Sequence, residues 1–196
     1  MTGTLYITGD AAADELLNND PLALLLGMLL DQQVPMQWAF KGPESLRQRL
    51  GGTLDANAIA AMPQEDLVAV FCDKPALHRF PAVMARRTHD LCVTLSERYD
   101  GDASRIWKGT RKASVVYDRL RELPGFGDEK SRIFLALLAK RFKVRPTGWQ
   151  EASLPFSDEV PRTIADVTNP ATLAAVQKFK KEMKAAKRDK QGRALA

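Results

Sequence analysis

Residues 123–130 read LPGFGDEK and separate two stretches whose apolar side chains recur at the spacing of an α-helix. The first stretch covers 113–122 and the second covers 128–142. The proline and the two glycines between them end the first helix and let the backbone turn tightly, because a glycine has no Cβ to clash. The pattern predicts two amphipathic helices joined as a hairpin, with Phe126 pointing inward and the amides of both glycines uncovered.

Helical signals dominate the rest of the chain as well. Asp20 and Pro21 form a start signal, since a carboxylate caps the first turn and proline suits the first helical position, and Asp10 is placed to cap an earlier helix. The one strand-like stretch is TLYIT at 4–8, which has no second strand with which to form a sheet. We therefore predict an all-α fold. Further helices are predicted at 21–30, 35–40, 43–50, 55–61, 63–71, 81–99, 103–107 and 170–187.

Length and composition narrow the class of protein. The 196 residues are 45% hydrophobic, enough for one core, and we treat 1–196 as a single unit with a lobe boundary near 101–109. Cys72 and Cys92 are too few for a disulfide framework or a four-cysteine metal site. The longest apolar stretch, 22–30, is shorter than the roughly 18 residues that span a bilayer. These observations predict a monomeric, cytoplasmic protein that binds no membrane.

Positive charge is concentrated in two segments of a chain whose net charge is +5. Residues 105–145 hold 12 Lys or Arg against 4 Asp or Glu, and residues 178–193 hold 8 against 2, so the remainder is acidic. Charge segregated in this way is typical of a surface that faces phosphates. For the C-terminal segment 178–196, a solvated basic helix and tail is the alternative interpretation.

The glycine turn adds a specific anion site to this basic surface. Gly125 and Gly127 would leave their amides uncovered at the N-terminus of the second helix, where the positive end of the helix dipole also favours an anion. Lys130 and Arg132 lie in the next turn and add charge. A phosphate group is the ligand that this combination predicts.

The stretch LPGFGDEKS at 123–131 resembles the helix–hairpin–helix motif, LPGxGxxxA, of the base-excision-repair DNA glycosylases related to endonuclease III and adenine glycosylase. In that family the turn amides hold a DNA backbone phosphate, commonly through a bound monovalent cation, Na⁺ or K⁺, which would lie at Gly125 and Gly127 here. Ser131 stands in place of the usual alanine. The same motif is a non-specific DNA clamp in ligases, nucleases and polymerases, and a chance helix connection is the alternative. The resemblance implies DNA-binding roles for Leu123, Pro124, Gly125, Phe126 and Gly127.

A second stretch, LLLGMLLDQQVPMQWAF at 24–40, resembles the early helix of the same family, in which an apolar run ends in a glutamine-containing turn. In those relatives the glutamine fills the space left by a base that has been flipped out of the duplex. The matching residue here is Gln33, with Gln32 beside it; two glutamines that merely end a buried helix are the alternative. The likeness covers about 20–145 and implies a two-lobed all-α fold with double-stranded DNA bound between the lobes.

Three departures from the family limit the expected reaction. Glu129 occupies the position of the lysine that forms a Schiff base in bifunctional members, so no lyase step by that route is expected. Thr147 or Pro146 falls at the aspartate that stabilises the sugar cation. Either another carboxylate takes this role or the reaction does not occur, and the catalytic candidates are Asp31 and Glu151. The four cysteines of the family's iron–sulfur cluster are absent from the sequence, so no such cluster is expected.

The remaining aromatic and histidine residues have mostly structural interpretations. Trp38 and Trp107 are predicted to be core anchors, and His78 and His89 show no metal-binding spacing with a cysteine. Trp149 is the aromatic residue that we expect to stack on a flipped base.

The leading interpretation is a monofunctional DNA N-glycosylase. Such a protein would grip duplex DNA at the glycine turn, flip a damaged or mismatched base with help from Gln33, and hydrolyse its glycosidic bond. The alternative on the same scaffold is a non-catalytic protein that recognises distorted DNA. A helical protein–protein module that binds no DNA is the third class. The sequence does not specify the damaged base, because the residues that would line its pocket are scattered.

Overall fold

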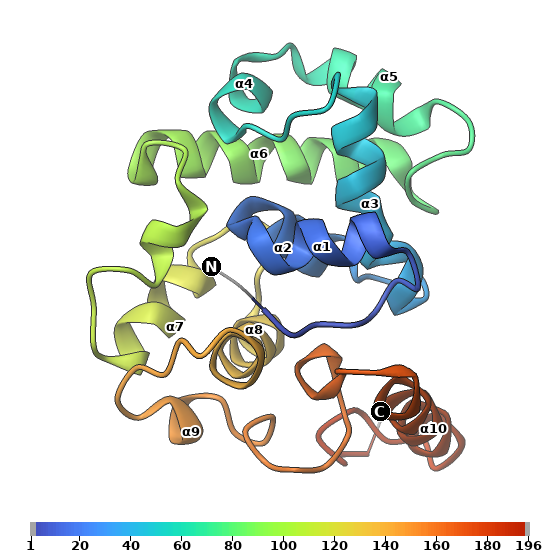
Figure 1. The fold of residues 1–196 in the computed structure, drawn as a ribbon, viewed down its shortest axis with the longest axis vertical. Coiled ribbons are helices and arrows are strands. Elements are labelled where there is room, and N and C mark those ends of the chain that lie inside the picture. The colour runs from blue at the N-terminus through green and yellow to red at the C-terminus, as the bar shows by residue number, and fades with distance from the viewer. Residues whose placement is uncertain (1–2, 195–196) are drawn as a thin grey trace.

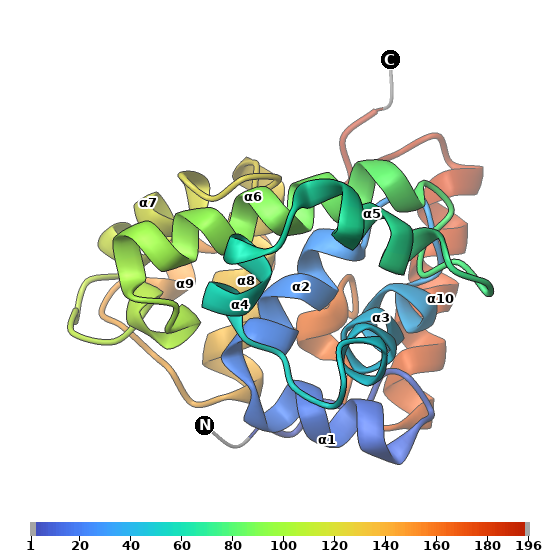
Figure 2. The same cartoon turned by 90° about the horizontal axis from the view of Figure 1, so that it is seen from above.

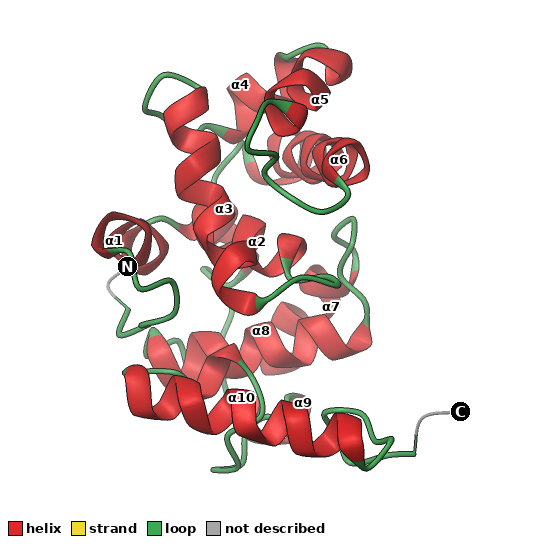
Figure 3. Ribbon diagram, turned by 90° about the vertical axis from the view of Figure 1, so that its right-hand side faces the viewer, coloured by secondary structure: helices red, strands yellow, loops and turns green. Residues whose placement is uncertain are grey.

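The computed structural model describes residues 3–194, and over that range it contains only helices and loops (Figure 1). Figure 3 shows the same arrangement coloured by secondary structure. The predicted all-α class is confirmed. The helices are α1 (Ala11–Asn19), α2 (Pro21–Leu30), α3 (Met36–Arg49), α4 (Ala56–Ala61), α5 (Gln64–Cys72), α6 (Pro81–Tyr99), α7 (Ala113–Arg121), α8 (Asp128–Arg141), α9 (Trp149–Ala152) and α10 (Pro170–Ala185), with 3₁₀ helices η1 (Ala103–Ile106) and η2 (Ile164–Asp166).

Two helices begin where their capping signals predicted. The carboxylate of Asp10 accepts hydrogen bonds from two amides in the first turn of α1, at 3.1 and 3.2 Å. Asp20 does the same for α2, at 2.8 and 3.2 Å, and Pro21 follows as the first helical residue. Because α2 is apolar on all sides, it is buried from Leu22 to Leu30. Figure 2 shows α2 at the centre of the molecule.

The other helices pack around α2 in two groups. Helices α3 and α6 lie against α2, and α4 and α5 cover α6; on the other side, α8 packs against α7, α9 and η2, with α10 beside η2 (Figure 1). The buried side chains form one continuous cluster that extends from Leu5 to Val176. No helix in residues 3–194 combines the length and the apolar character that crossing a bilayer demands.

The predicted strand at 4–8 is wrong. Its main-chain donors bond to side chains of α1 rather than to another strand: Leu5 donates to Asn18 Oδ1 at 2.8 Å, and Ile7 donates to Asp14 Oδ1 at 3.2 Å. The apolar side chains of this segment are buried against the core. The alternating pattern therefore reflects a segment with one buried face and no strand partner.

Two predicted helix boundaries also differ from the structure. The stretches 35–40 and 43–50 form one helix, α3, which continues through Pro43. Proline usually interrupts a helix, because it lacks an amide hydrogen and its ring crowds the preceding turn. The helix packs tightly on α2 at this point, since a Cβ built on Gly42 would lie 2.6 Å from Leu30 Cδ1. The stretch 103–107 forms the 3₁₀ helix η1 instead of an α-helix.

The predicted C-terminal helix forms as α10, which ends two residues earlier than expected. The segment 186–194 then turns back on itself and makes an isolated bridge between Arg188 and Ala194. Residues 195–196 of the predicted basic tail lie outside the described residues.

Candidate nucleic-acid interface

The glycine turn connects α7 to α8 through two short-range hydrogen bonds. The amide of Leu123 donates to the carbonyl of Leu120 at 3.1 Å, and the amide of Phe126 donates to the carbonyl of Leu123 at 3.1 Å. The Phe126 ring is 5% exposed and meets Phe134 of α8 edge to face, with ring centroids 5.9 Å apart. The inward position predicted for Phe126 is confirmed, and this aromatic contact fixes the turn on the core.

The two glycines of the turn have different surroundings. Gly125 has a φ of +80°, and a Cβ built on it would lie 2.4 Å from Cδ1 of Leu29 in α2, so any other residue would strain the backbone and displace the Leu29 side chain. Gly127 has an ordinary φ of −92°, and nothing lies within 4 Å of its Cβ position. Both glycines are exposed, and neither amide donates a hydrogen bond within residues 3–194. The main chain at Gly127 is therefore accessible to a ligand.

Lys130 joins this turn to the end of α2. Its ammonium donates to the carbonyls of Met28 at 2.6 Å and Leu29 at 2.9 Å. These carbonyls belong to the last turn of α2, where carbonyl oxygens have no amide partner within the helix. The negative end of the helix dipole also favours a cation there. Burial lowers the pKa of Lys130 to about 8, and the neighbouring Asp31 carboxylate opposes that shift. Lys130, predicted to bind DNA, is thus directed at a helix end about 100 residues away in the sequence.

Two further side chains bind the same helix end. Gln32 donates to the carbonyl of Leu29 at 2.7 Å and accepts a hydrogen bond from Arg87 of α6 at 2.6 Å. His78 donates from Nε2 to the carbonyl of Leu30 at 3.1 Å, since its Nδ1 accepts a main-chain amide hydrogen at 3.0 Å. Burial lowers the pKa of His78, which favours the neutral ring that these two hydrogen bonds require. The turn after α2 is consequently held by side chains from three other segments, which contain His78, Arg87 and Lys130.

Gln33 stands apart from this network. Its φ is +56°, a left-handed conformation that residues other than glycine rarely adopt. Its side chain is exposed and makes no hydrogen bond within the part of the chain that the structure describes, whereas Gln32 is anchored at both ends of its amide. Of the two glutamines, Gln33 is the one free to contact a ligand. Backbone strain of this kind is concentrated at functional sites.

Two carboxylates lie near Lys130. Asp31 follows the last residue of α2, and both it and Glu129 raise the pKa of Lys130 against the effect of burial. Glu129, in the first turn of α8, pairs with Lys190 of the C-terminal segment at 3.3 Å. Burial lowers the pKa of Lys180 in α10, and Asp31 and Glu129 again oppose the shift. Sequence reasoning missed Lys180 and Lys190, because no local pattern signals that α10 lies beside α8.

Arg132, also predicted to bind DNA, is already paired. Its Nε lies 2.9 Å from Asp128 Oδ1, and Asp128 also accepts a hydrogen bond from the hydroxyl of Tyr117. The hydrogen bond from Tyr117, and to a smaller extent that from Arg132, hold the pKa of the Asp128 carboxyl below its usual range. The first turn of α8 contains two acids and two bases over 128–132. It therefore offers an anion its amides rather than an excess of positive charge.

The other predicted site residues, Trp149 and Glu151, lie in α9 beside the start of α7, and the cavity that Glu151 lines extends to Arg132 of α8. The amide of Ala113, the first residue of α7, donates to the carbonyl of Thr147 at 3.0 Å, whereas the glycine turn follows the last residue of α7, about 13 Å along the helix. Glu151 is exposed and lines a cavity of about 560 Å³ with side chains of α7 and α8. Trp149 is half-buried and packs against the core. Neither Glu151 nor Trp149 takes part in the hydrogen bonds at the end of α2.

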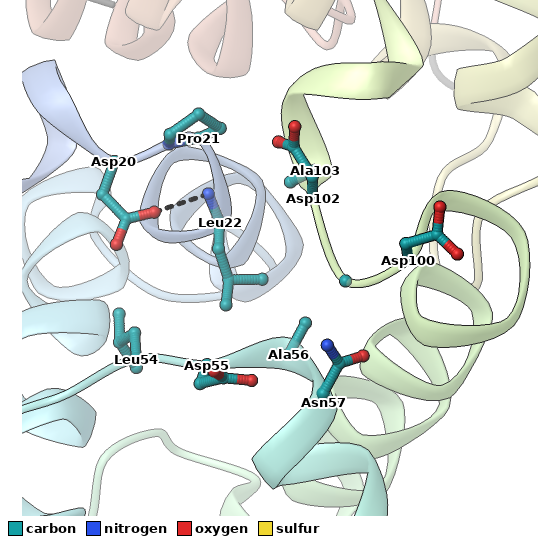
Figure 4. A pocket seen from close by; sticks show the side chains of 11 residues that line it. Asp20, Pro21, Leu22, Leu54, Asp55, Ala56, Asn57, Asp100, Asp102 and Ala103 are labelled. Carbon is teal, nitrogen blue, oxygen red and sulfur yellow. Dashed lines mark hydrogen bonds between the residues drawn. The ribbon is translucent and has the colours of Figure 1, made fainter.

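A separate cavity of about 310 Å³ is acidic (Figure 4). It lies between the starts of α2 and α4 and the segment after α6, and its lining includes Asp20, Asp55, Asp100 and Asp102. Asp20 and Asp55 are engaged as helix caps. Because carboxylates repel phosphates, this cavity does not suit a nucleic acid. Over residues 3–194 there is also no group of three or more His, Cys, Asp or Glu side chains arranged to hold a metal ion.

Comparison with known proteins assigns no family to the chain. No protein-family model matches it, and no curated protein matches it significantly. The functional interpretation therefore depends on the residues and geometry described above.

Proposed function

We propose that this protein binds duplex DNA and removes a base from it, on the helix–hairpin–helix glycosylase fold that its sequence resembles. One observation carries the proposal: Gly125 lies against Leu29, and Lys130 bonds to the last carbonyls of α2. The glycine turn and the end of α2 therefore lie side by side, although they are about 100 residues apart in the sequence. Each of these two segments separately resembles the same family.

Phosphate binding falls to main-chain amides in this proposal. The first amides of α8 have no intrahelical partner, and the positive end of the helix dipole favours a negatively charged oxygen there. The surface at Gly127 is open, so a phosphate can approach the backbone closely.

We propose that carbonyl oxygens of the turn bind the monovalent cation that the resemblance implies. Hard cations prefer oxygen ligands, and the carbonyls of Leu123 and Gly127 each accept one hydrogen bond and keep a second lone pair. Such an ion would supply positive charge between the turn and the phosphate, which the neutral first turn of α8 does not provide.

Gln33 is the residue that we propose to enter the duplex. Opening a base pair costs a few kcal/mol in stacking and pairing, and a polar side chain that fills the gap stabilises the opened state. The side chain of Gln33 is exposed and makes no hydrogen bond within residues 3–194, which supports this role. The side chain of Gln32 is anchored, which supports a role for Gln32 in positioning Gln33.

Asp31 is the carboxylate that we propose to act on the sugar. Cleavage of an N-glycosidic bond develops positive charge on the sugar, and a carboxylate stabilises that charge and positions water. Asp31 is half-buried and lies two residues before Gln33. Glu129 cannot form an imine, so the reaction ends at hydrolysis, without a lyase step.

Abasic-site formation tests the activity. Duplexes that each contain one modified or mismatched base are incubated with excess protein, and strand cleavage after alkali reports the abasic product. We expect Asp31→Asn to slow the single-turnover rate by about 100-fold or more. Glu151→Gln is the matched control, because Glu151 takes no part in the hydrogen bonds at the end of α2, and it should keep the wild-type rate. Wild-type activity in Asp31→Asn would reject Asp31 as the catalytic group.

Non-catalytic recognition of distorted DNA is the second candidate function. Two observations favour it. Thr147, at the position of the family's aspartate, lies beside the start of α7, and Glu129, at the position of the family's lysine, forms an ion pair with Lys190. Neither of the family's two catalytic positions therefore holds a catalytic group. Tight binding to mismatched duplexes without any abasic product would favour this candidate. Absence of duplex binding at low salt would reject both candidates and leave a protein–protein module.

A further inference from the structure

A cavity of about 500 Å³ beside the glycine turn is lined by basic side chains. It lies between the end of α6, the loop that follows and α7, and its lining residues are Arg98, Tyr99, Arg105, Lys108, Gly109 and Arg119. Four of the six are cationic and none is acidic. The segment after α6 thus contributes to two cavities of opposite charge, this one and the acidic cavity of Figure 4.

Arg119 holds the wall of this cavity in shape. Its guanidinium donates to the carbonyls of Arg105, Ile106 and Lys108, at 3.1, 3.2 and 3.4 Å. A planar group with several fixed donors is well suited to order a loop in this way. Because these bonds fix the main chain at Arg105 and Lys108, the cationic side chains of both residues start from a defined position.

The other cations of the cavity are available to an anion. Arg98 pairs with Glu122 and Arg105 pairs with Asp100, but the two arginine side chains are 47% and 53% exposed, and exposed pairs contribute little stability. Lys108 forms no ion pair among residues 3–194. A phosphate accepts bidentate hydrogen bonds from arginine as a carboxylate does, so it can replace those exposed partners.

We propose that this cavity binds a phosphate group through Arg98, Arg105 and Lys108, as a second anion site beside the glycine turn. The two sites adjoin each other, because Glu122 pairs with Arg98 and immediately precedes Leu123. For a phosphate of the DNA backbone, the inference rests on the proposed function. A small phosphate compound free in solution would present the same oxyanion, and its binding would not depend on the proposed function. The experiment below distinguishes a phosphate of DNA from a free phosphate compound.

The test combines duplex binding with binding of inorganic pyrophosphate. The variant Arg105→Gln/Lys108→Gln removes two cations from the cavity. Lys41→Gln controls for the loss of an exposed cation elsewhere, because Lys41 of α3 pairs with Asp10, and it equals the single variant Lys108→Gln in charge. For the cavity variant we expect the plot of log affinity against log salt concentration to be shallower by about 0.9. Pyrophosphate affinity, measured by calorimetry, should fall about tenfold or more. The control should match the wild type in both measurements.

The outcomes distinguish this inference from the proposed function. A shallower salt slope supports the site with DNA as the source of phosphate. Loss of pyrophosphate binding in the cavity variant, when the wild type binds no duplex, supports the site and rejects the proposed function. If neither quantity changes in a folded variant, the inference is wrong even where duplex binding is intact. Lys108→Gln alone breaks no ion pair, so it repeats the test should the double variant not fold.

Discussion

Alanine substitutions at the two glycines of the turn separate the fold from ligand binding. In Gly125→Ala the new Cβ would lie 2.4 Å from Cδ1 of the fully buried Leu29, in a backbone with a φ of +80°. The left-handed conformation costs an L-residue about 1–2 kcal/mol, and overpacking a core costs about 1–3 kcal/mol. We therefore expect the free energy of unfolding to fall by about 2–5 kcal/mol. Gly127→Ala has an ordinary φ and open surroundings, so its change should stay within about 0.5 kcal/mol.

Urea unfolding followed by circular dichroism measures these stabilities, and fluorescence anisotropy with a labelled duplex measures DNA affinity in the same preparations. Gly127→Ala, and more strongly Gly127→Val, should keep the fold but weaken duplex affinity by about tenfold or more, because the side chain blocks approach to the main chain. Equal stabilities for Gly125→Ala and the wild type would refute the packing argument. Unchanged duplex affinity in Gly127→Val would refute the role of the turn.

The end of α2 and the glycine turn give three further predictions. The pKa of Lys130 is about 8 in the folded protein, whereas an ordinary lysine has a pKa of 10.5. Between pH 8 and pH 10.5 the folded state therefore binds fewer protons than the unfolded state. The contribution of Lys130 to stability consequently rises with pH over this range, by about 3 kcal/mol. Urea unfolding across this pH range should show a larger rise in the wild type than in Lys130→Met, in which Lys180, whose pKa is also lowered by burial, still contributes; equal rises would contradict the assignment. Phe126→Ala removes a buried ring and should lower the free energy of unfolding by about 3–5 kcal/mol, whereas a loss below about 1 kcal/mol would mean that the ring does not anchor the turn. Gln33→Gly removes the strain of a left-handed backbone, so it should raise the free energy of unfolding by about 0.5 kcal/mol. The same variant should reduce base opening, which 2-aminopurine fluorescence in the duplex measures. A less stable Gln33→Gly variant would show that the protein itself holds the glutamine side chain.

Local signals predicted those parts of the fold that local contacts decide. A helix cap is made within three residues, so the sequence around Asp10 and Asp20 contains both partners. The inward position of Phe126 follows from the helical spacing on both sides of the turn. The strand at 4–8 was wrong because an alternating pattern arises in any segment with one buried face, and α1 supplies its hydrogen-bond partners.

The candidate site was predictable only in part, because its decisive contacts join distant segments. Lys130 was expected to face a ligand, but the end of α2 takes its ammonium. Gln32 and Gln33 are equivalent in the sequence, and Arg87 of α6 decides which of them is anchored. Similarly, only the packing of the C-terminal segment brings a lysine to Glu129.

The central claim is that the glycine turn and the turn after α2 form one surface that binds duplex DNA. An amide-resolved NMR titration of isotope-labelled protein with a short duplex at low salt tests this claim residue by residue. We predict that the signals of Gly125, Gly127 and Gln33 shift together along one binding curve, while that of Asn57 in the acidic cavity stays in place. Unshifted Gly127 and Gln33 signals in the presence of excess duplex would contradict the claim.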